Sequence, residues 1–170
     1  VYAWDVIDVA RSYGWFTGKD ETFSFSDAYA PLDFSAARFC EARVWAGFNT
    51  VNSQMGQYLD YAMGENLNNR MPLWIKPDRK LEPRDVMSMM RNYYQDSPMD
   101  MTKDVGAGPY GSTVRWRPMQ WEVDGVKYIH ERAISTQQTG FSFVAQSRSW
   151  LPDPVGVIFW FASTTRIIQF

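Results

Sequence analysis

The sequence predicts an α+β fold, with helices in the first half of the chain and antiparallel strands in the second. Apolar residues recur at helical spacing in the first half, whereas beyond residue 115 they alternate with polar ones. The pair Asp124-Gly125 lies between two alternating runs, which is a strong signal for a tight hairpin turn. An antiparallel sheet that follows helices needs cover on at least one face, and this combination predicts the α+β class.

The first fifty residues contain two predicted helices. The run Asp5–Tyr13 has apolar residues at helical spacing, and Gly14 follows it as a C-cap. The stretch Gly18–Asp33 is rich in Asp and Ser and is predicted to be a surface loop. Ser35 is a good N-cap for a second helix over Ala36–Phe48.

A short strand and a third helix are predicted in the middle of the chain. The run Leu73–Lys76 is strand-like and ends at Pro77. Glu82 as cap, Pro83 at the first helical position and Asp85 in the first turn mark the start of the helix. Three methionines on this helix are expected to face the core: Met87, Met89 and Met90.

Four strands are predicted in the second half. The turn Asp124-Gly125 pairs Arg115–Val123 with Val126–Ser135, because a type I′ turn needs two residues that tolerate positive φ. Two further strands, Phe141–Arg148 and Val155–Phe161, are joined by a short proline-containing turn and are expected to be antiparallel neighbours. The last strand is apolar on both faces, which predicts cover on both sides.

The composition excludes several classes of function. Of 170 residues, 17 are Lys or Arg and 19 are Asp or Glu, so the basic excess that nucleic acids or anionic membranes require is absent. No apolar run approaches the roughly 20 residues of a membrane span. Aromatic residues make up 16% of the chain, too much apolar surface for a disordered protein. We expect neither a nucleic acid nor a membrane partner, while oligomerisation and compartment stay open.

The residues alone contain no self-sufficient catalytic group or metal site. Cys40 and His130 are the single cysteine and histidine, so disulfides and histidine-pair zinc sites are excluded. Cys40 is predicted in the middle of a helix as a small core residue, and not at the helix N-terminus that activates a thiol. We therefore expect no cofactor and no catalytic residue within these 170 residues.

Polar side chains gather at the ends of the predicted strands. Arg132 lies on the second strand, Gln137 and Gln138 follow it, and Arg148 ends the third strand. Guanidinium and amide groups beside apolar strands suit recognition of a carboxylate or an amide. The alternative interpretation of these polar side chains is a sheet edge at which they only face water.

Long segments of the chain resemble the bacterial N-terminal-nucleophile cysteine dipeptidases of the dipeptidase D type. The longest matching run is ERAISTQQTGFSFVAQSRSWLPDPVG, from Glu131 to Gly156. The resemblance covers residues 1 to about 161 in the same order. Supporting segments are Arg38–Trp45, Phe48-Asn49, Asn69–Pro77, Asp100–Pro109 and Arg115–Pro118.

The resemblance implies a peptide hydrolase of the four-layer αββα fold. In that family an N-terminal cysteine attacks the amide bond and its own α-amino group acts as the base, so no histidine and no cofactor is needed. Dipeptides are the implied substrates. Two facing sheets between helical layers would also explain why Val155–Phe161 is apolar on both sides.

The chain departs from this family at both ends. The nucleophile belongs to a segment that would precede Val1, and Cys40 matches an ordinary helix position of the family. The family's continuation after Phe161 is also replaced by a different ending. We therefore expect a partial dipeptidase domain over residues 1–161, an atypical end over 162–170, and a chain that is inactive alone.

The resemblance also implies substrate-binding residues. Related amidases of this fold hold substrate and catalytic cysteine with an arginine on a core strand, which corresponds to Arg132, with Gln137 and Gln138 as further substrate contacts. The structural alternative for Arg132 is an ion pair with Glu131 or a surface position.

Two rival functions remain open. One is an acylase that cleaves other amides, such as penicillins or bile-salt conjugates. The other is a non-catalytic carbohydrate-binding module, which exposure of two or more of four indoles would favour. These four are Trp116, Trp121, Trp150 and Trp160.

Overall fold

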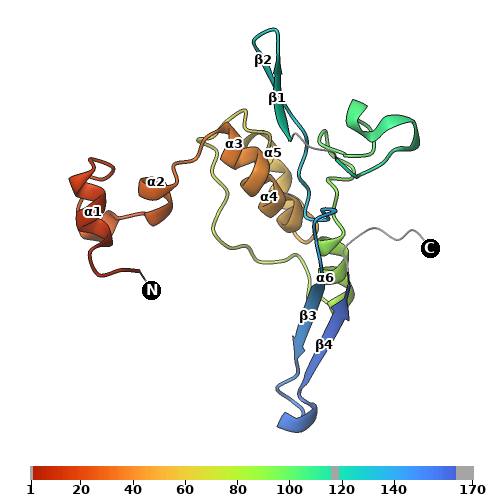
Figure 1. Ribbon diagram of the computed structural model, residues 1–170. Coiled ribbons are helices and arrows are strands. Elements are labelled where there is room, and N and C mark those ends of the chain that lie inside the picture. The colour runs from red at the N-terminus through yellow and green to blue at the C-terminus, as the bar shows by residue number, and fades with distance from the viewer. Residues whose placement is uncertain (1, 116–118, 164–170) are drawn as a thin grey trace.

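The computed structural model describes residues 2–115 and 119–163, and its first elements form a small aromatic unit (Figure 1). Helix α1 (Val6–Ser12) confirms the first predicted helix, and Gly14 follows it at φ 71°. The predicted loop after it is more ordered than expected. It contains a 3₁₀ turn (Asp20–Thr22) and helix α2 (Phe25–Tyr29), because the Ser24 hydroxyl accepts from the Asp27 amide at the helix start.

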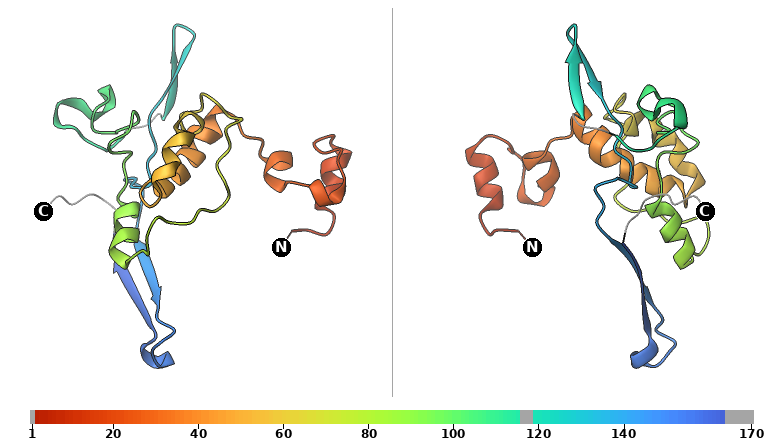
Figure 2. Two further views of the ribbon diagram at one scale, coloured as in Figure 1. Left: turned by 180° about the vertical axis from the view of Figure 1, so that it is seen from behind. Right: turned by 45° about the vertical axis from the view of Figure 1, so that its right-hand side comes forward.

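This aromatic unit stands apart from the rest of the chain in both views of Figure 2. Its rings contact one another in sequence, with centroid separations of 4.7–5.3 Å; three of the pairs are stacked, and Trp15 meets Tyr29 edge to face. The Arg70 guanidinium, from a distant loop, donates to the Asp27 carboxylate at 2.9 Å. The rings in this series are Tyr2, Phe25, Tyr29, Trp15 and Tyr13.

A continuous helical segment follows, and its start and its buried face differ from the prediction. It comprises α3 (Phe34–Ala36), a π-helical turn (Ala37–Glu41) and α4 (Ala42–Asn49). Asp33 is the N-cap, with its carboxylate accepting from the Ala36 amide at 2.7 Å, so the prediction of Ser35 as cap is wrong.

The π turn also corrects the predicted burial of Cys40. A π-helix repeats at i+5, so Ala37 and Ala42 both face the core and are fully buried. Cys40 lies between them in sequence and turns outward to solvent. The expectation of a core cysteine assumed an unbroken α-helical period.

Helix α4 is the centre of the hydrophobic core. A 3₁₀ segment (Ser53–Tyr58) and α5 (Leu59–Ala62) pack beside it, and the Trp45 indole donates to the Met55 carbonyl at 2.8 Å. The buried cluster around α4 consists of Ala42, Trp45, Ala46, Ala62, Tyr94, Met99, Met101 and Ala133.

The middle of the chain confirms the predicted helix and corrects the predicted strand. Helix α6 (Pro83–Met90) begins after Glu82, whose amide donates to the Asp85 carboxylate at 2.8 Å. The run 73–76 is irregular and exposed, because no strand among the described residues lies beside it. The three methionines of α6 are half-buried and do not enter the core.

The strands of the second half form two separate hairpins, which point to opposite ends of the molecule in Figure 1. Strands β1 (Gln120–Val123) and β2 (Val126–Ile129) are joined by Asp124 and Gly125 at φ 51° and 78°, as the type I′ prediction requires. Strands β3 (Ser142–Ser147) and β4 (Val157–Ala162) are antiparallel neighbours, also as predicted. The α+β class is therefore confirmed, with strands shorter than expected.

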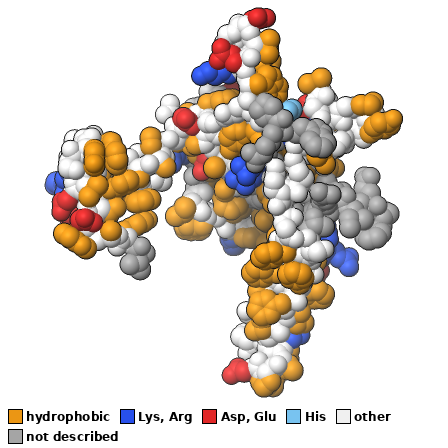
Figure 3. All heavy atoms as spheres, in the orientation of Figure 1, with side chains coloured by type: hydrophobic (Ala, Val, Ile, Leu, Met, Phe, Trp, Pro, Cys, Tyr) orange, Lys and Arg blue, Asp and Glu red, His pale blue; other side chains and the backbone are white. Residues whose placement is uncertain are grey.

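The β3–β4 hairpin leaves one apolar face bare. Val144 and Trp160 face a groove of about 200 Å³ beside Met87 and Met90 of α6. On the other face Phe159 is 68% exposed, and Figure 3 shows a patch of hydrophobic side chains along this hairpin. Within the described residues the last strand therefore has a neighbour, α6, on one face only, and the cover expected on its other face is absent.

The remaining described elements are short. A 3₁₀ segment (Val105–Tyr110) lies between α6 and β1, and another (Asp153–Val155) precedes β4. Within residues 2–115 and 119–163, no helix is both long and apolar enough to cross a membrane.

We expect an alanine substitution in the core and one on the bare face to have very different effects on the unfolding free energy. Phe159→Ala should change the unfolding free energy by no more than about 0.5 kcal/mol, because that side chain is exposed. It should also lower the fluorescence of a dye that binds exposed apolar surface. Trp45→Ala should cost about 3–5 kcal/mol, because it empties a buried site. Urea unfolding measures both values, and a large loss in Phe159→Ala would contradict the exposed placement.

Candidate functional site

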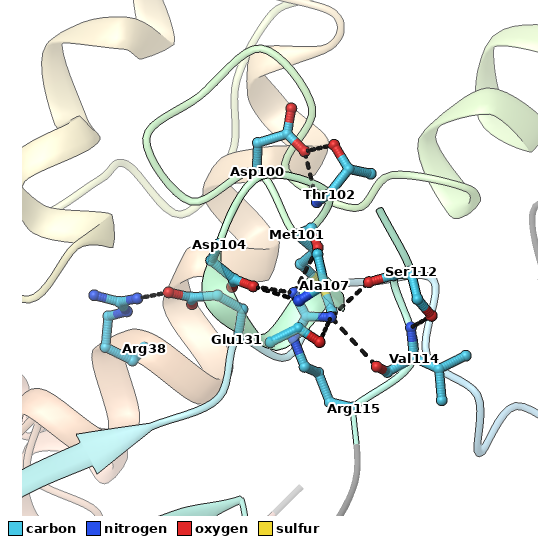
Figure 4. Close-up of polar contacts among 11 residues, drawn as sticks. Arg38, Asp100, Met101, Thr102, Asp104, Ala107, Ser112, Val114, Arg115 and Glu131 are labelled. Atoms are coloured by element: carbon cyan, nitrogen blue, oxygen red, sulfur yellow. Dashed lines mark hydrogen bonds and ion pairs between the residues drawn. The ribbon is translucent and has the colours of Figure 1, made fainter. Parts of the chain in front are cut away.

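Residues from three of the segments that carry the sequence resemblance, Arg38, Asp104 and Arg115, are linked to the region of residues 131–138. Arg38, on the π turn, donates to the carboxylate of Glu131, which lies 93 positions further along the chain (Figure 4). The two side chains are 12% and 13% exposed. This buried ion pair fixes the segment after β2 against the central helix, and the predicted alternative of a pair between Glu131 and Arg132 is not formed.

Arg115 organises the loop that precedes the hairpin. The residue is 2% exposed, and its guanidinium donates to the Asp104 carboxylate at 2.7 Å. Figure 4 shows the guanidinium surrounded by backbone oxygens. It donates to the carbonyls of Met101 (2.5 Å), Ser112 (2.7 Å), Gly106 (3.3 Å) and Val114 (3.3 Å).

Gly106 is required by this arrangement. A Cβ at this position would lie 3.0 Å from the Arg115 Nε and 3.2 Å from the Asp104 Oδ1. A larger residue would push against both partners of the ion pair. Close packing therefore explains why the Asp100–Pro109 motif has a glycine at position 106.

Three backbone contacts hold the segment that carries the predicted substrate residues. The Tyr94 hydroxyl donates to the Arg132 carbonyl at 2.8 Å, and the Ser135 amide donates to the Asn92 carbonyl at 3.0 Å. The side-chain amide of Gln137 donates to the backbone carbonyl of Arg115. Gln137 therefore ties the segment to the Arg115 loop.

Arg132 and Gln138 line one open cavity of about 270 Å³, and both side chains are exposed. Phe39 from the π turn and Met119 and Gln120 from the start of the hairpin complete its wall. A guanidinium fork and an amide beside an apolar wall can bind a carboxylate in one orientation. The structure thus brings two of the three predicted substrate residues together and places Gln137 elsewhere.

Burial shifts the pKa of two groups that hold the Arg132 segment, Glu131 and Tyr94. Burial raises the pKa of Glu131, and the nearby Asp104 carboxylate adds to this, while Arg38 acts in the opposite direction. Burial also raises the pKa of Tyr94, so its hydroxyl stays protonated and keeps donating to Arg132. These groups position the segment.

The single cysteine and histidine do not form a catalytic pair. Cys40 is exposed within the helical segment 34–49, and the His130 ring packs against Trp121 with centroids 4.6 Å apart. Within the part of the chain that the structure describes, no hydrogen bond joins the two, and no cluster of three metal-ligating side chains occurs.

Comparison with known proteins identifies the family. The model of peptidase family C69 matches residues 1–169. The chain therefore belongs to peptidase family C69, which makes it a member of a family of peptide hydrolases and confirms the family that the motifs indicated. Comparisons with curated proteins and with solved structures found no match.

The two arginine networks are the part of the site that the sequence did not predict. Arg38 and Arg115 lie inside the motifs that carry the resemblance, but nothing in their local pattern names their partners. The partners themselves are 93 and 11 positions away.

We expect Arg115→Lys to destabilise the protein by about 3 kcal/mol. A lysine ammonium has three donors and cannot reproduce the planar fork that serves five acceptors, so buried carbonyls would lose their partners. Urea unfolding measures the loss, and Arg84→Lys, at an exposed position of α6, is the matched control. A loss below about 0.5 kcal/mol would show that the buried guanidinium does not hold the loop.

The raised pKa of Glu131 has a consequence for pH dependence. The folded state binds this proton more tightly than the unfolded state, where the pKa is near 4.5. The contribution of Glu131 to stability is therefore complete below that pH and is lost as the pH rises through the folded-state pKa. Glu131→Gln removes the titration, so the unfolding free energy of the wild type minus that of the variant should fall between pH 4 and pH 7. A difference that rises over this range would show a lowered pKa.

Proposed function

We propose that this chain forms the substrate-binding part of a cysteine dipeptidase. The observation that carries the proposal is the cavity in which Arg132 and Gln138 come together, within a member of peptidase family C69. Arg132 binds the C-terminal carboxylate of a dipeptide, and Gln138 donates to or accepts from its amide group. Gln137 acts indirectly, by fixing the segment to Arg115.

The attacking thiol in this proposal belongs to an N-terminal cysteine outside these 170 residues. Cys40 is the single cysteine of the sequence, and it lies in the middle of a helical segment where no helix N-terminus stabilises a thiolate. An N-terminal cysteine uses its own α-amino group as base, which agrees with the absence of a pairing between Cys40 and His130.

The same proposal includes the four-layer αββα architecture. The bare face of β3–β4 is a flat apolar surface of the kind that packs against a second sheet. Helix α6 covers the opposite face, as a helical layer would. In the complete enzyme the bare face would contact the second sheet of the sandwich.

Binding to the Arg132 cavity tests the proposal directly. Arg132→Ala should weaken binding of dialanine to the full chain about tenfold, because one charge-assisted contact is lost. Arg84→Ala, also at an exposed position, is the control and should bind as the wild type does. Calorimetric titration measures both affinities, and equal dialanine affinity in Arg132→Ala and wild type would remove Arg132 from the site.

The source of the thiol has a separate test. In a polypeptide that contains this chain and cleaves dipeptides, Cys40→Ala should leave kcat/KM unchanged within about twofold, because this thiol does not attack the substrate. Release of free amino acid measures the rate. Hydrolysis by the 170-residue chain that disappears in Cys40→Ala would overturn the proposal. Cleavage of penicillins or bile-salt conjugates in place of dipeptides would identify an acylase.

One observation favours a carbohydrate-binding module as the second candidate. Trp150 is 73% exposed and Trp160 is 43% exposed, and exposed indoles are platforms for sugar rings. Trp121 is half-buried, and Trp116 lies outside the described residues. Binding of soluble oligosaccharides that Trp150→Ala abolishes would favour this candidate.

A further inference from the structure

A second cavity, of about 480 Å³, is lined by the 3₁₀ segment Ser53–Tyr58 and by the irregular segment 72–78. The second of these segments belongs to the long connection between α5 and α6 in Figure 1. This cavity shares no lining residue with the Arg132 cavity, and neither Trp150 nor Trp160 lines it. Its volume is within the roughly 300–1,000 Å³ of pockets that take small ligands. The cavity is therefore a separate place at which a ligand could bind.

Hydrogen bonds join the two walls of this cavity. The side-chain amide of Asn52 donates to the Lys76 carbonyl at 2.9 Å. The backbone amide of Ser53 donates to the Asp78 carboxylate at 2.8 Å, and the Asp78 amide donates to the Val51 carbonyl at 2.9 Å. Because these contacts fix both walls before a ligand arrives, binding loses less free energy to ordering.

The apolar part of the lining includes two aromatic rings. The indole of Trp74, on one wall, is 77% exposed. The half-buried ring of Tyr58 and the buried side chain of Met55 line the cavity from the 3₁₀ segment. A ligand with a flat face of C–H groups can stack on the indole and remove this apolar surface from water.

The polar part of the lining includes two planar amide groups. The side chains of Gln54 and Gln57 are exposed, and no residue that the structure describes pairs with their amide groups. The same is true of the Tyr58 hydroxyl within the described ranges. An amide group both donates and accepts hydrogen bonds, as a hydroxyl does, so these groups match the hydroxyls of a ligand in either direction.

The charges of the lining are balanced. Lys76 contributes one ammonium, and Asp78 contributes one carboxylate, which already accepts from the Ser53 amide. A cleft lined by charges of one sign concentrates ions of the opposite sign, whereas a balanced lining concentrates neither. The lining therefore suits a neutral ligand that carries hydroxyl groups and a flat apolar face.

We propose that this cavity binds a short neutral oligosaccharide. A pyranose ring stacks its C–H face on the Trp74 indole, and its hydroxyl groups pair with the side-chain amides of Gln54 and Gln57. The Tyr58 hydroxyl supplies a further donor and acceptor. Because the two cavities share no residue, the inference is independent of the proposed function.

A proline-rich peptide fits the lining less well than an oligosaccharide. Such a peptide can also cover an exposed indole with an apolar ring. Proline lacks a backbone N–H, so a proline-rich peptide offers acceptors alone and leaves the carbonyl oxygens of Gln54 and Gln57 without donors. Hydroxyl groups supply both.

Calorimetric titration of the full chain with cellotriose and with triacetylchitotriose tests the site. Sorbitol is the control ligand, because it has hydroxyl groups but no ring that can stack. We expect at least one trisaccharide to bind and sorbitol not to bind. The proposal is overturned if neither trisaccharide binds or if sorbitol binds equally well. Binding of hexaproline in place of the sugars would identify a peptide groove and would also overturn it.

Variants of Trp74 test the stacking contact. Trp74→Ala should weaken trisaccharide binding at least tenfold, whereas Trp74→Phe keeps a flat ring and should weaken it about threefold or less. Trp150→Ala is the matched control, because that indole is 73% exposed and lies outside the lining, so this variant should bind as the wild type does. Loss of binding in Trp150→Ala with no loss in Trp74→Ala would place the sugar elsewhere and overturn the proposal.

Gln54→Leu and Gln57→Leu test the polar contacts. Leucine has a similar size but no amide group, so each variant should weaken trisaccharide binding about threefold to tenfold. Both side chains are exposed, so both variants should unfold at the same urea concentration as the wild type. Wild-type affinity in both variants would contradict the proposal. Arg132→Ala should leave trisaccharide binding unchanged, which keeps this test separate from that of the dipeptidase proposal.

Discussion

The buried guanidinium of Arg115 is the contact on which the candidate site depends. It satisfies four carbonyls and one carboxylate at once, and its own carbonyl accepts from Gln137. Without it the buried carbonyl of Met101 would have no partner in this contact, at a cost of about 1–3 kcal/mol. Because the guanidinium of Arg115 holds the loop and its backbone carbonyl accepts from the Gln137 side chain, the position of the Arg132 segment follows from this one residue.

The Arg38–Glu131 ion pair is the second contact that positions the Arg132 segment. It orients this segment more than it stabilises the fold. Burial of two charges costs about as much as their attraction returns, and the raised pKa of Glu131 reflects that balance. The pair nevertheless joins the π turn to the segment after β2, so Phe39 and Arg132 face the same cavity. A specific ion pair orients these groups in a way that nondirectional apolar contact cannot.

Local features of the fold were predictable from the sequence, and features set by distant contacts were not. The start of α6 and the Asp124-Gly125 turn depend on neighbouring residues, and both were predicted correctly. The exposure of Cys40 depends on one π turn, which shifts the buried face by a residue and leaves no mark in an apolar pattern. Arg132 and Gln138 were named from a family motif, whereas Phe39 and Met119 reach the site only through the fold.

The aromatic surfaces of the chain divide into those that the described fold uses and those that it leaves open. Trp45 and Tyr94 are buried around α4, and each donates a hydrogen bond that keeps its polar atom satisfied. Phe159 and its neighbours on the bare face have no polar atom to satisfy, and they alternate along a flat strand pair. Such a surface fits a second sheet at about 10 Å better than it fits water, because each exposed ring retains the hydration cost that burial would remove. The Arg132 cavity and the bare face are therefore independent features, because the cavity is lined by Phe39, Met119, Gln120, Arg132 and Gln138 and by no residue of β3 or β4.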